Sequence, residues 1–163
     1  MLANFNFDPI SVITLLITLS LAPFAALLVS SFVKIVVVLT LVRNALGVQQ
    51  VPPNMVLNGL AIMLSLYIMY PVINDTGKIA LDIDFKANSL EEVTAIVNKV
   101  KVPLQKFLFK HSSEVDRSFF LRSAQKLWPE SLSADVKEDD FMVLLPAFTV
   151  TELTSSFQIG FLL

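Results

Sequence analysis

The sequence has little of what enzymes and metal proteins use. It contains no cysteine, one histidine and four glycines in 163 residues. Disulfides and thiolate metal sites are therefore excluded, and the sequence has no G-x-S-x-G motif and no phosphate-binding glycine loop. The one histidine, His111, stands beside Lys110 and Ser112, and we interpret it as a surface residue of a helical region rather than as a ligand. We expect neither an enzyme nor a cofactor-binding protein.

Charge is also scarce at both ends of the chain. Only four of the 26 formal charges lie outside residues 75–140, and they belong to Asp8, Lys34, Arg43 and Glu152. Hydrophobic residues make up 55% of the sequence, against about 45–50% in typical soluble domains. A polar segment between two apolar flanks indicates a membrane-associated protein.

The polar segment carries no strong binding motif. The net charge is −2, and no basic run is long enough to indicate nucleic-acid binding. Two acidic clusters, Asp82/Asp84 and Glu138/Asp139/Asp140, lack the spacing and the glycine of an EF-hand loop. We interpret both as solvated acidic turns, with a structural calcium site as the alternative.

The most informative stretch is residues 43–54, which we call the elbow; it contains the end of one apolar arm, the polar turn Gln49 to Pro53 and the start of a second arm. The first arm ends at Leu46-Gly47, where glycine suits a left-handed helix cap. Arg43 lies in the last turn of this arm, where a cation meets the negative end of the helix dipole. The first arm is therefore predicted to be a helix that ends at the elbow.

The second arm starts after two prolines. Pro52 and Pro53 lack N–H groups and push their predecessors out of the α region. Asn54 follows at the expected N-cap of a second helix, which is predicted to run from Met55 to Ile73. Its 19 uncharged residues are long enough to span a bilayer.

This elbow resembles the signature of the FliP/SctR (YscR) family, membrane export-gate subunits of bacterial type III secretion systems. The matching run is nearly contiguous and contains the paired glutamines and the paired prolines. Residues 75–140 resemble the family only loosely. Further matching residues are Phe32, Val33, Lys34, Asn58, Gly59, Leu60, Pro71, Leu144 to Phe148, Glu152, Leu153 and Phe157 to Phe161.

The resemblance implies an all-α structural subunit of an export gate. Several copies, five in the family, would assemble helically with two smaller membrane subunits, and the lumen would pass unfolded proteins across the bacterial inner membrane. Family members continue into a further hydrophobic hairpin with a Met-rich loop, so we expect this chain to be part of a longer protein. Flagellar members often carry a signal sequence. Because Met1 to Asp8 lacks a basic n-region, we expect a virulence-type member.

We therefore expect membrane-associated helical hairpins with a small helical insert. Residues 1–74 would form the first hairpin, with a kink or division at Pro23, residues 75–140 the insert, and residues 141–163 the start of a second hairpin. Because the short elbow carries Arg43 and no acid, it should face the cytoplasm, and the insert should be extracytoplasmic.

Three helices are expected in the insert. The first begins near Ser89 and the second at Pro103. The third is capped by Ser113 and runs from Glu114 to Trp128, where Pro129 stops it. Each has one apolar stripe and one charged face, which is typical of helices packed in a small bundle. An acidic connection follows to residue 140.

The last segment departs from a plain membrane span. Glu152 lies in a polar run, and a carboxylate at mid-membrane costs roughly 2.5–3.5 kcal/mol on insertion scales. Pro146 is expected to break the helix. This segment should therefore face protein or a water-filled lumen.

Charged and polar residues within the apolar segments are the candidate functional residues. For Lys34 the alternatives are snorkelling to the interface and pairing within the assembly, with Glu152 across subunits as one option. For the elbow residues the alternatives are helix and loop capping or contacts with backbone groups of neighbouring subunits. The candidate contact residues are Lys34, Arg43, Asn44, Gln49, Gln50, Pro52, Pro53, Asn54 and Glu152.

Two other functions remain open at this point. In a small-solute transporter or ion-channel subunit, Lys34 and Glu152 would line an ion path. In a membrane-tethered sensory protein, residues 75–140 would fold alone and bind a ligand.

Overall fold

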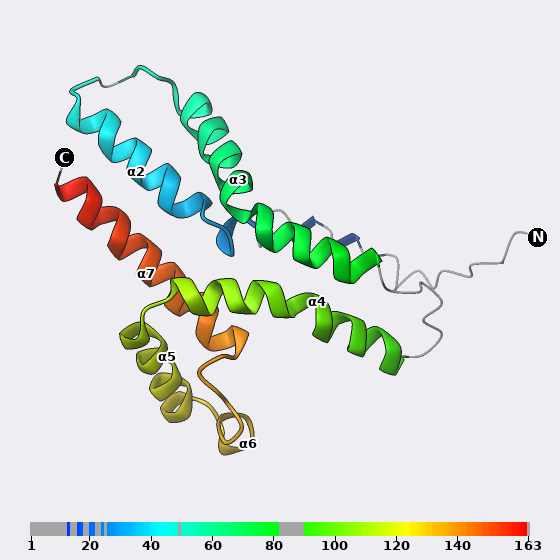
Figure 1. Ribbon diagram of the computed structural model, residues 1–163. Coiled ribbons are helices and arrows are strands. Elements are labelled where there is room, and N and C mark those ends of the chain that lie inside the picture. Colours follow the sequence, from blue (N-terminus) through cyan, green and yellow to red (C-terminus); the bar gives the residue numbers. More distant parts are fainter. Residues whose placement is uncertain are drawn as a thin grey trace, which may run out of the picture.

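The computed structural model describes residues 13, 16, 17, 20, 21, 24, 26–48, 50–81 and 90–162. Every regular element in these ranges is a helix, which confirms the predicted all-α fold class. In Figure 1, α2 and α7 lie side by side, α3 returns from the elbow, and α4 lies along the second half of α3. Helices α5 and α6 lie on the other side of α4, away from the elbow. The division expected at Pro23 lies outside the described residues.

Two helices form the predicted hairpin. Helix α2 (Phe32–Ala45) is followed by Gly47 in the left-handed region, with φ 69°. Glycine adopts this conformation without a Cβ clash, so the predicted cap is confirmed. Helix α3 (Asn54–Leu81) then returns along α2. It continues past Ile73, where the sequence predicted its end.

Two helices of the insert, α4 and α5, agree with the prediction to different degrees. Helix α4 (Leu90–His111) is continuous, so the separate helix expected from Pro103 is wrong. The stretch around Ser89 lies outside the described residues. Helix α5 (Glu114–Leu127) is the predicted third helix, and the Ser113 side chain accepts a hydrogen bond from the backbone N–H of Asp116.

The end of α5 also follows the sequence. Trp128 is extended before Pro129, as expected for a residue that precedes proline. The connection to the last helix begins with the short α6 (Glu130–Ser133), which the sequence did not predict. Helix α7 (Phe141–Phe161) then runs unbroken through Pro146, so the predicted break is wrong.

The three internal prolines are tolerated for a common reason. A proline within a helix leaves the carbonyl of the residue four positions earlier without its usual N–H partner. Those earlier residues are Tyr67, Lys99 and Met142, and all three are exposed. The turn before each proline therefore includes an exposed residue, and we infer that solvent or a neighbouring molecule can reach the freed carbonyl there.

The hydrophobic core joins the insert to the flanks. Its buried residues come from α3, α4 and α7, and they are Met69, Phe107, Leu108, Leu144 and Phe148. The rings of Phe107 and Phe148 lie 5.8 Å apart, a favourable distance for aromatic side chains. In the described part of the chain, helix α4 thus packs on α3 and α7, rather than in a separate bundle of insert helices.

Helices α2 and α7 run in the same direction and approach closely at one end (Figure 1). A Cβ added at Gly160 would lie 2.2 Å from Cδ1 of Leu41 and 3.0 Å from its Cβ. Leu41 would have to shift to admit any side chain at this position. This contact fixes how near the end of α7 lies to α2.

Candidate functional site

The elbow is closed by Arg43 from the last turn of α2. Its Nη1 donates to the carbonyl of Pro52 at 3.3 Å and to Oδ1 of Asn54 at 2.6 Å. The guanidinium therefore ties the end of one helix to the start of the next. Charge-assisted hydrogen bonds of this kind are roughly twice as strong as neutral ones.

The start of α3 differs by one residue from the prediction. The N–H groups of Val56 and Leu57 both donate to the carbonyl of Pro53, at 2.9 and 3.3 Å. Pro53 thus occupies the cap position, and Asn54 is the first helical residue. The Asn54 carboxamide accepts from Arg43, so its predicted role as a helix N-cap is wrong.

The other elbow residues mostly face outward. Asn44, Gln50, Pro53 and Asn54 are exposed, and Pro52 is half-buried after a cis peptide bond with Val51. Gln49 lies outside the described residues. The elbow also exposes the apolar side chains Leu46, Val48 and Val51. An outer surface with amide groups and apolar groups together is suited to contacts with another protein.

The structure joins Lys34 and Glu152 within one chain. Nζ of Lys34 lies 3.3 Å from Oε1 of Glu152, which links the first turn of α2 to the middle of α7. The Glu152 side chain is 6% exposed and that of Lys34 35%. The carboxylate is thus held inside the protein, whereas the ammonium group reaches its edge.

The ion pair belongs to a row of buried residues along one face of α7, apolar in its first half and polar in its second. Leu144, Phe148, Glu152 and Ser156 follow one another at four-residue spacing, and all are buried. The Ser156 hydroxyl donates to the Glu152 carbonyl at 2.6 Å and lies 3.4 Å from the carbonyl of Lys34. The apolar half of this row meets the core, and the polar half meets α2.

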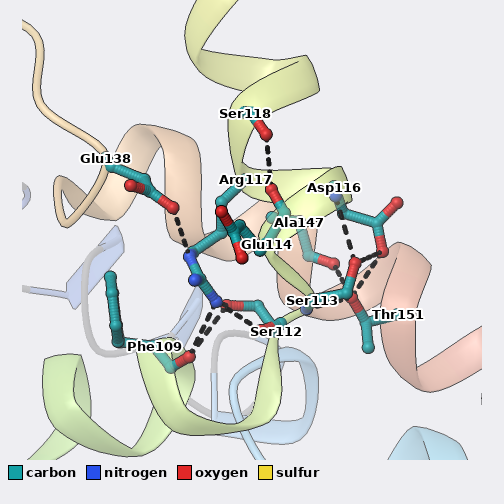
Figure 2. A network of polar contacts seen from close by, with 10 residues as sticks. All are labelled: Phe109, Ser112, Ser113, Glu114, Asp116, Arg117, Ser118, Glu138, Ala147 and Thr151. Atoms are coloured by element: carbon teal, nitrogen blue, oxygen red, sulfur yellow. Dashed lines mark hydrogen bonds and ion pairs between the residues drawn. The ribbon is translucent and has the colours of Figure 1, made fainter.

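A second polar centre, around Arg117, was missed in the sequence. Arg117 is 9% exposed and its Nε donates to Oε1 of Glu138 at 2.8 Å. Its Nη1 donates to the carbonyls of Phe109, at 3.1 Å, and Ser112. Its guanidinium carbon also lies 4.1 Å from the centre of the Phe109 ring. Figure 2 shows the Arg117 side chain, which extends from the start of α5, in contact with the end of α4 and with the segment before α7.

A neighbouring set of bonds attaches this centre to α7 (Figure 2). The backbone N–H of Ser113 donates to Oγ1 of Thr151 at 2.9 Å. The Thr151 hydroxyl lies 2.6 Å from Oδ2 of Asp116, to which it donates. Asp116 also accepts from the Ser113 hydroxyl at 2.7 Å. The α4–α5 turn is thus attached to α7 one residue from Glu152.

Residues 138–140 form hydrogen bonds within the protein. Glu138 accepts from Arg117, the Asp139 carbonyl accepts from Gln105 at 2.6 Å, and Oδ2 of Asp140 accepts from the N–H of Lys137 at 2.7 Å. Among the described residues, no group of three or more His, Asp or Glu side chains is placed to hold a metal ion. The other acidic cluster, Asp82/Asp84, lies outside the described residues.

His111 is placed more firmly than a free surface residue. Its ring is half-buried and lies 4.3 Å from that of Phe107. Its Nδ1 lies 2.8 Å from the Phe107 carbonyl. Since a carbonyl only accepts, Nδ1 carries the proton and Nε2 is the remaining polar atom.

Only one described helix, over Asn54–Ile79, is long and apolar enough to cross a membrane by length and composition. Its buried positions follow a four-residue spacing at Leu57, Ala61, Ser65 and Met69, with small residues at the middle two that permit close helix approach. Most of its other large apolar side chains are exposed. A lipid environment or neighbouring chains must cover them.

Comparison with known proteins agrees with the signature of the elbow. The FliP family model matches residues 15–163. The chain is 48% identical to the hypersensitivity response secretion protein HrcR of Ralstonia nicotianae, over 97% of this chain and 74% of that protein. It is 43% identical to the Yop proteins translocation protein R of Yersinia pestis, over 96% of this chain and 72% of that protein. It is 37% identical to the virulence protein YscR of Salmonella typhimurium, over 96% and 72%. The names of these relatives agree with the expected virulence type, and the chain belongs to the FliP family.

Proposed function

We propose that this chain is a structural subunit of the export gate of a virulence-type type III secretion system. In this proposal, several copies and smaller membrane subunits assemble in the bacterial inner membrane around a conduit for unfolded proteins. Membership of the FliP family and the secretion and translocation names of its relatives support the assignment. Five copies, as the family resemblance implies, is the expected number.

The observation that carries the proposal is the combination of satisfied charges and exposed apolar surface. Lys34 and Glu152 pair within the chain. In contrast, large apolar residues are exposed along α3 and at the end of α7, with Met55 at 86% and Phe161 at 93%. For a single chain in water, exposure of these apolar side chains is unfavourable. Burial of this apolar area against sister chains, partners and lipid is favourable by about 25 cal/mol per Å².

The elbow provides the polar part of the proposed contacts. Arg43 fixes its shape from inside, so Asn44, Gln50, Pro52, Pro53 and Asn54 form a preformed outer surface. Preformed surfaces lose little conformational entropy on binding. We propose that this surface faces the cytoplasm, as the positive charge of Arg43 favours, and that the 75–140 insert is extracytoplasmic.

The two alternative functions are less well supported. An ion path would use Lys34 and Glu152, but each neutralises the other. A sensory domain would need an insert that folds alone, whereas Phe107 and Leu108 of the insert are buried against Met69 and Leu144 of the flanks. Energy for transport would come from other components of the system.

The proposal is tested by the mass of the native complex. The full-length protein would be expressed with its secretion system, extracted in mild detergent and analysed by native mass spectrometry. We expect several copies together with unrelated, smaller membrane subunits. A simple homo-oligomer that moves a solute by itself would favour a transporter, and a monomer that supports secretion would contradict the gate.

A further inference from the structure

An exposed stripe of side chains runs along one face of α5. Four residues at spacings of three or four positions form it, and they are Val115, Phe119, Arg122 and Lys126. All four are exposed, the first two at 75% and 57%. At 3.6 residues per turn, the buried residues Arg117 and Ala124 lie on the opposite face. The α5 stripe is therefore the side of the helix that no other described element covers.

The α5 stripe has an apolar half and a cationic half. The ring of Phe119 lies 5.2 Å from that of Phe120 in an edge-to-face arrangement, which is favourable for aromatic side chains. Arg122 and Lys126 follow one turn apart, so both cations lie on the same side of the helix. Neither forms a salt bridge with a residue that the structure describes. A partner for this surface needs an apolar side chain next to two acids.

Residues 130–135, which we call the α6 segment, carry these groups. Leu132 is 62% exposed, and the exposed carboxylates of Glu130 and Asp135 stand on either side of it in the sequence. The N–H groups of Leu132 and Ser133 donate to the carbonyl of Pro129 at 2.9 and 3.0 Å, so the backbone here is already fixed. The two carboxylates form no salt bridge with a described residue. The α6 segment thus matches the α5 stripe in apolar character and in charge.

The two surfaces lie at the same end of the molecule. In Figure 1, α5 and α6 are both on the side of α4 that is away from the elbow. They contact each other within the chain, yet the cations of one and the carboxylates of the other stay unpaired among the described residues. A second copy of the chain supplies the complementary charge at the same level. Because the two surfaces differ, such a contact is head-to-tail and repeats from copy to copy into a ring or a helix.

We propose that the α5 stripe of one copy binds the α6 segment of the next copy. The apolar half of the stripe covers Leu132, and its cationic half pairs with Glu130 and Asp135. Burial of the apolar side chains supplies most of the free energy of this contact, and the charges fix its register. The inference rests on the proposed function, because it names one contact between the sister copies of that assembly.

The test is a crosslink between two copies, and it exploits the absence of cysteine from this sequence. Two differently tagged forms of the full-length protein, with any cysteine outside this sequence replaced by serine, are co-expressed with the secretion system. One form carries Phe119→Cys and the other Leu132→Cys, and both are treated with a short bismaleimide. A product with both tags requires that the two residues come from different copies. The control replaces Phe119→Cys by Gln125→Cys, which is exposed on α5 about a quarter turn from the stripe.

We expect the product with both tags from F119C and L132C, and at most a small fraction of it from Q125C and L132C. R122E/K126E, placed in the F119C form alone, should lower the yield roughly 2- to 30-fold, because two exposed ion pairs become repulsive. E130K/D135K, added to the L132C form alone, should restore it. Since neither form then carries both halves of the swap, pairing within one chain cannot explain the recovery. R122K/K126R keeps the charges and should change the yield less than about twofold.

Three results would overturn the proposal. They are equal yields with F119C and Q125C, a crosslink from F119C to a different protein instead of the sister copy, and failure of the charge swap to restore the product. The second would show that another component covers the α5 stripe. Native mass spectrometry of the same preparations separates this inference from the proposed function. If the crosslink fails while the complex keeps several copies, only this contact is wrong; a complex with one copy would contradict both.

Discussion

Lys34 and Glu152 are 118 residues apart in sequence and 3.3 Å apart in space. They are unequal partners, because the carboxylate is almost fully buried and the ammonium group is about one-third exposed. An uncompensated charge is costly only where water cannot reach it. Lys34 therefore compensates the buried negative charge of Glu152.

The first prediction follows from this inequality. Lys34→Met leaves a buried carboxylate alone and should destabilise the protein by about 3 kcal/mol, at the low end for broken buried pairs. Glu152→Gln leaves a lysine that can turn to solvent and should cost about 1 kcal/mol. Thermal unfolding of the detergent-solubilised full-length protein measures both.

A charge swap checks whether the two groups act directly on each other. The double variant Lys34→Glu/Glu152→Lys should recover part of the stability and complex yield lost in the single variants. Equal losses in K34M and E152Q, with no recovery in the swap, would argue against a direct pair and for separate contacts of each residue with other subunits.

The second prediction concerns the close approach of α2 and α7. Gly160→Ala should destabilise the protein by about 1–3 kcal/mol, because the new methyl group overlaps with Leu41. Gly59→Ala in α3 is the control, since nothing lies within 4 Å of its added Cβ. There we expect a gain of up to about 1 kcal/mol from helix propensity.

Because both substitutions replace glycine by alanine, opposite signs of their changes in stability would separate the effect of packing at residue 160 from that of helix propensity. Leu41→Ala combined with Gly160→Ala should remove the overlap, so the double variant should be more stable than additivity predicts. Strict additivity in thermal unfolding would show that Leu41 and Gly160 do not contact each other.

The third prediction concerns Arg117. Arg117→Met leaves two carbonyl groups and Glu138 without their donor, which should cost about 2–4 kcal/mol. Arg117→Lys should recover little, because an ammonium group cannot reproduce the planar fork of the guanidinium. Arg122→Lys, on the exposed side of α5, should change stability by less than about 0.5 kcal/mol.

Limited proteolysis of the full-length protein shows where Arg117 acts. We expect the R117M variant to be cut in the segment between α5 and α7 well before the wild type. Protection equal to that of wild type would mean that Glu138 and its neighbours are held by other contacts.

The fourth prediction compares two threonines on α7. Thr151→Val removes the hydroxyl that joins the Ser113 N–H to Asp116, and it should cost about 1–2 kcal/mol. Thr149→Val removes only a bond to the carbonyl of Leu145 in the same helix and should be near neutral. Amide hydrogen exchange of the α4–α5 turn should rise in T151V alone; an equal rise in both variants would contradict the attachment.

The fifth prediction concerns the elbow. Arg43→Ala removes the bonds to Pro52 and Asn54, with a loss of about 1–2 kcal/mol, and should also lower the yield of the native complex. Asn44→Ala, at an exposed neighbour, should leave stability unchanged. If N44A lowers complex yield at unchanged stability, Asn44 acts in a subunit contact, as the sequence suggests.

Local chemistry explains what could be predicted from the sequence. Gly47, Ser113 and Pro129 act on the backbone within a few residues of themselves, so their roles at helix ends follow from position alone. The all-α class follows from the same signals repeated along the chain. The family likewise rests on a contiguous run of residues, the elbow.

The features that the sequence did not predict depend on tertiary contacts. Arg117 gives no signal in the sequence, because its partners come from two segments, the end of α4 and the stretch before α7, and tertiary packing brings both to its side chain. The helix end predicted at Ile73, the helix start predicted at Pro103 and the break predicted at Pro146 were wrong, because whether a helix continues at these points depends on its tertiary surroundings. Asn54 was misassigned because Arg43, eleven residues earlier, competes for its side chain.

The proline within α3 has a mechanical consequence. The helix has 28 residues, or about 42 Å at 1.5 Å per residue, and it changes direction partway along its length in Figure 1. Pro71 breaks the ladder of hydrogen bonds at one rung, so bending strain concentrates there and the segments on either side behave as two stiff levers. A change of the bend at Pro71 would therefore change the angle between the half of α3 that packs on α2 and the half that packs on α4.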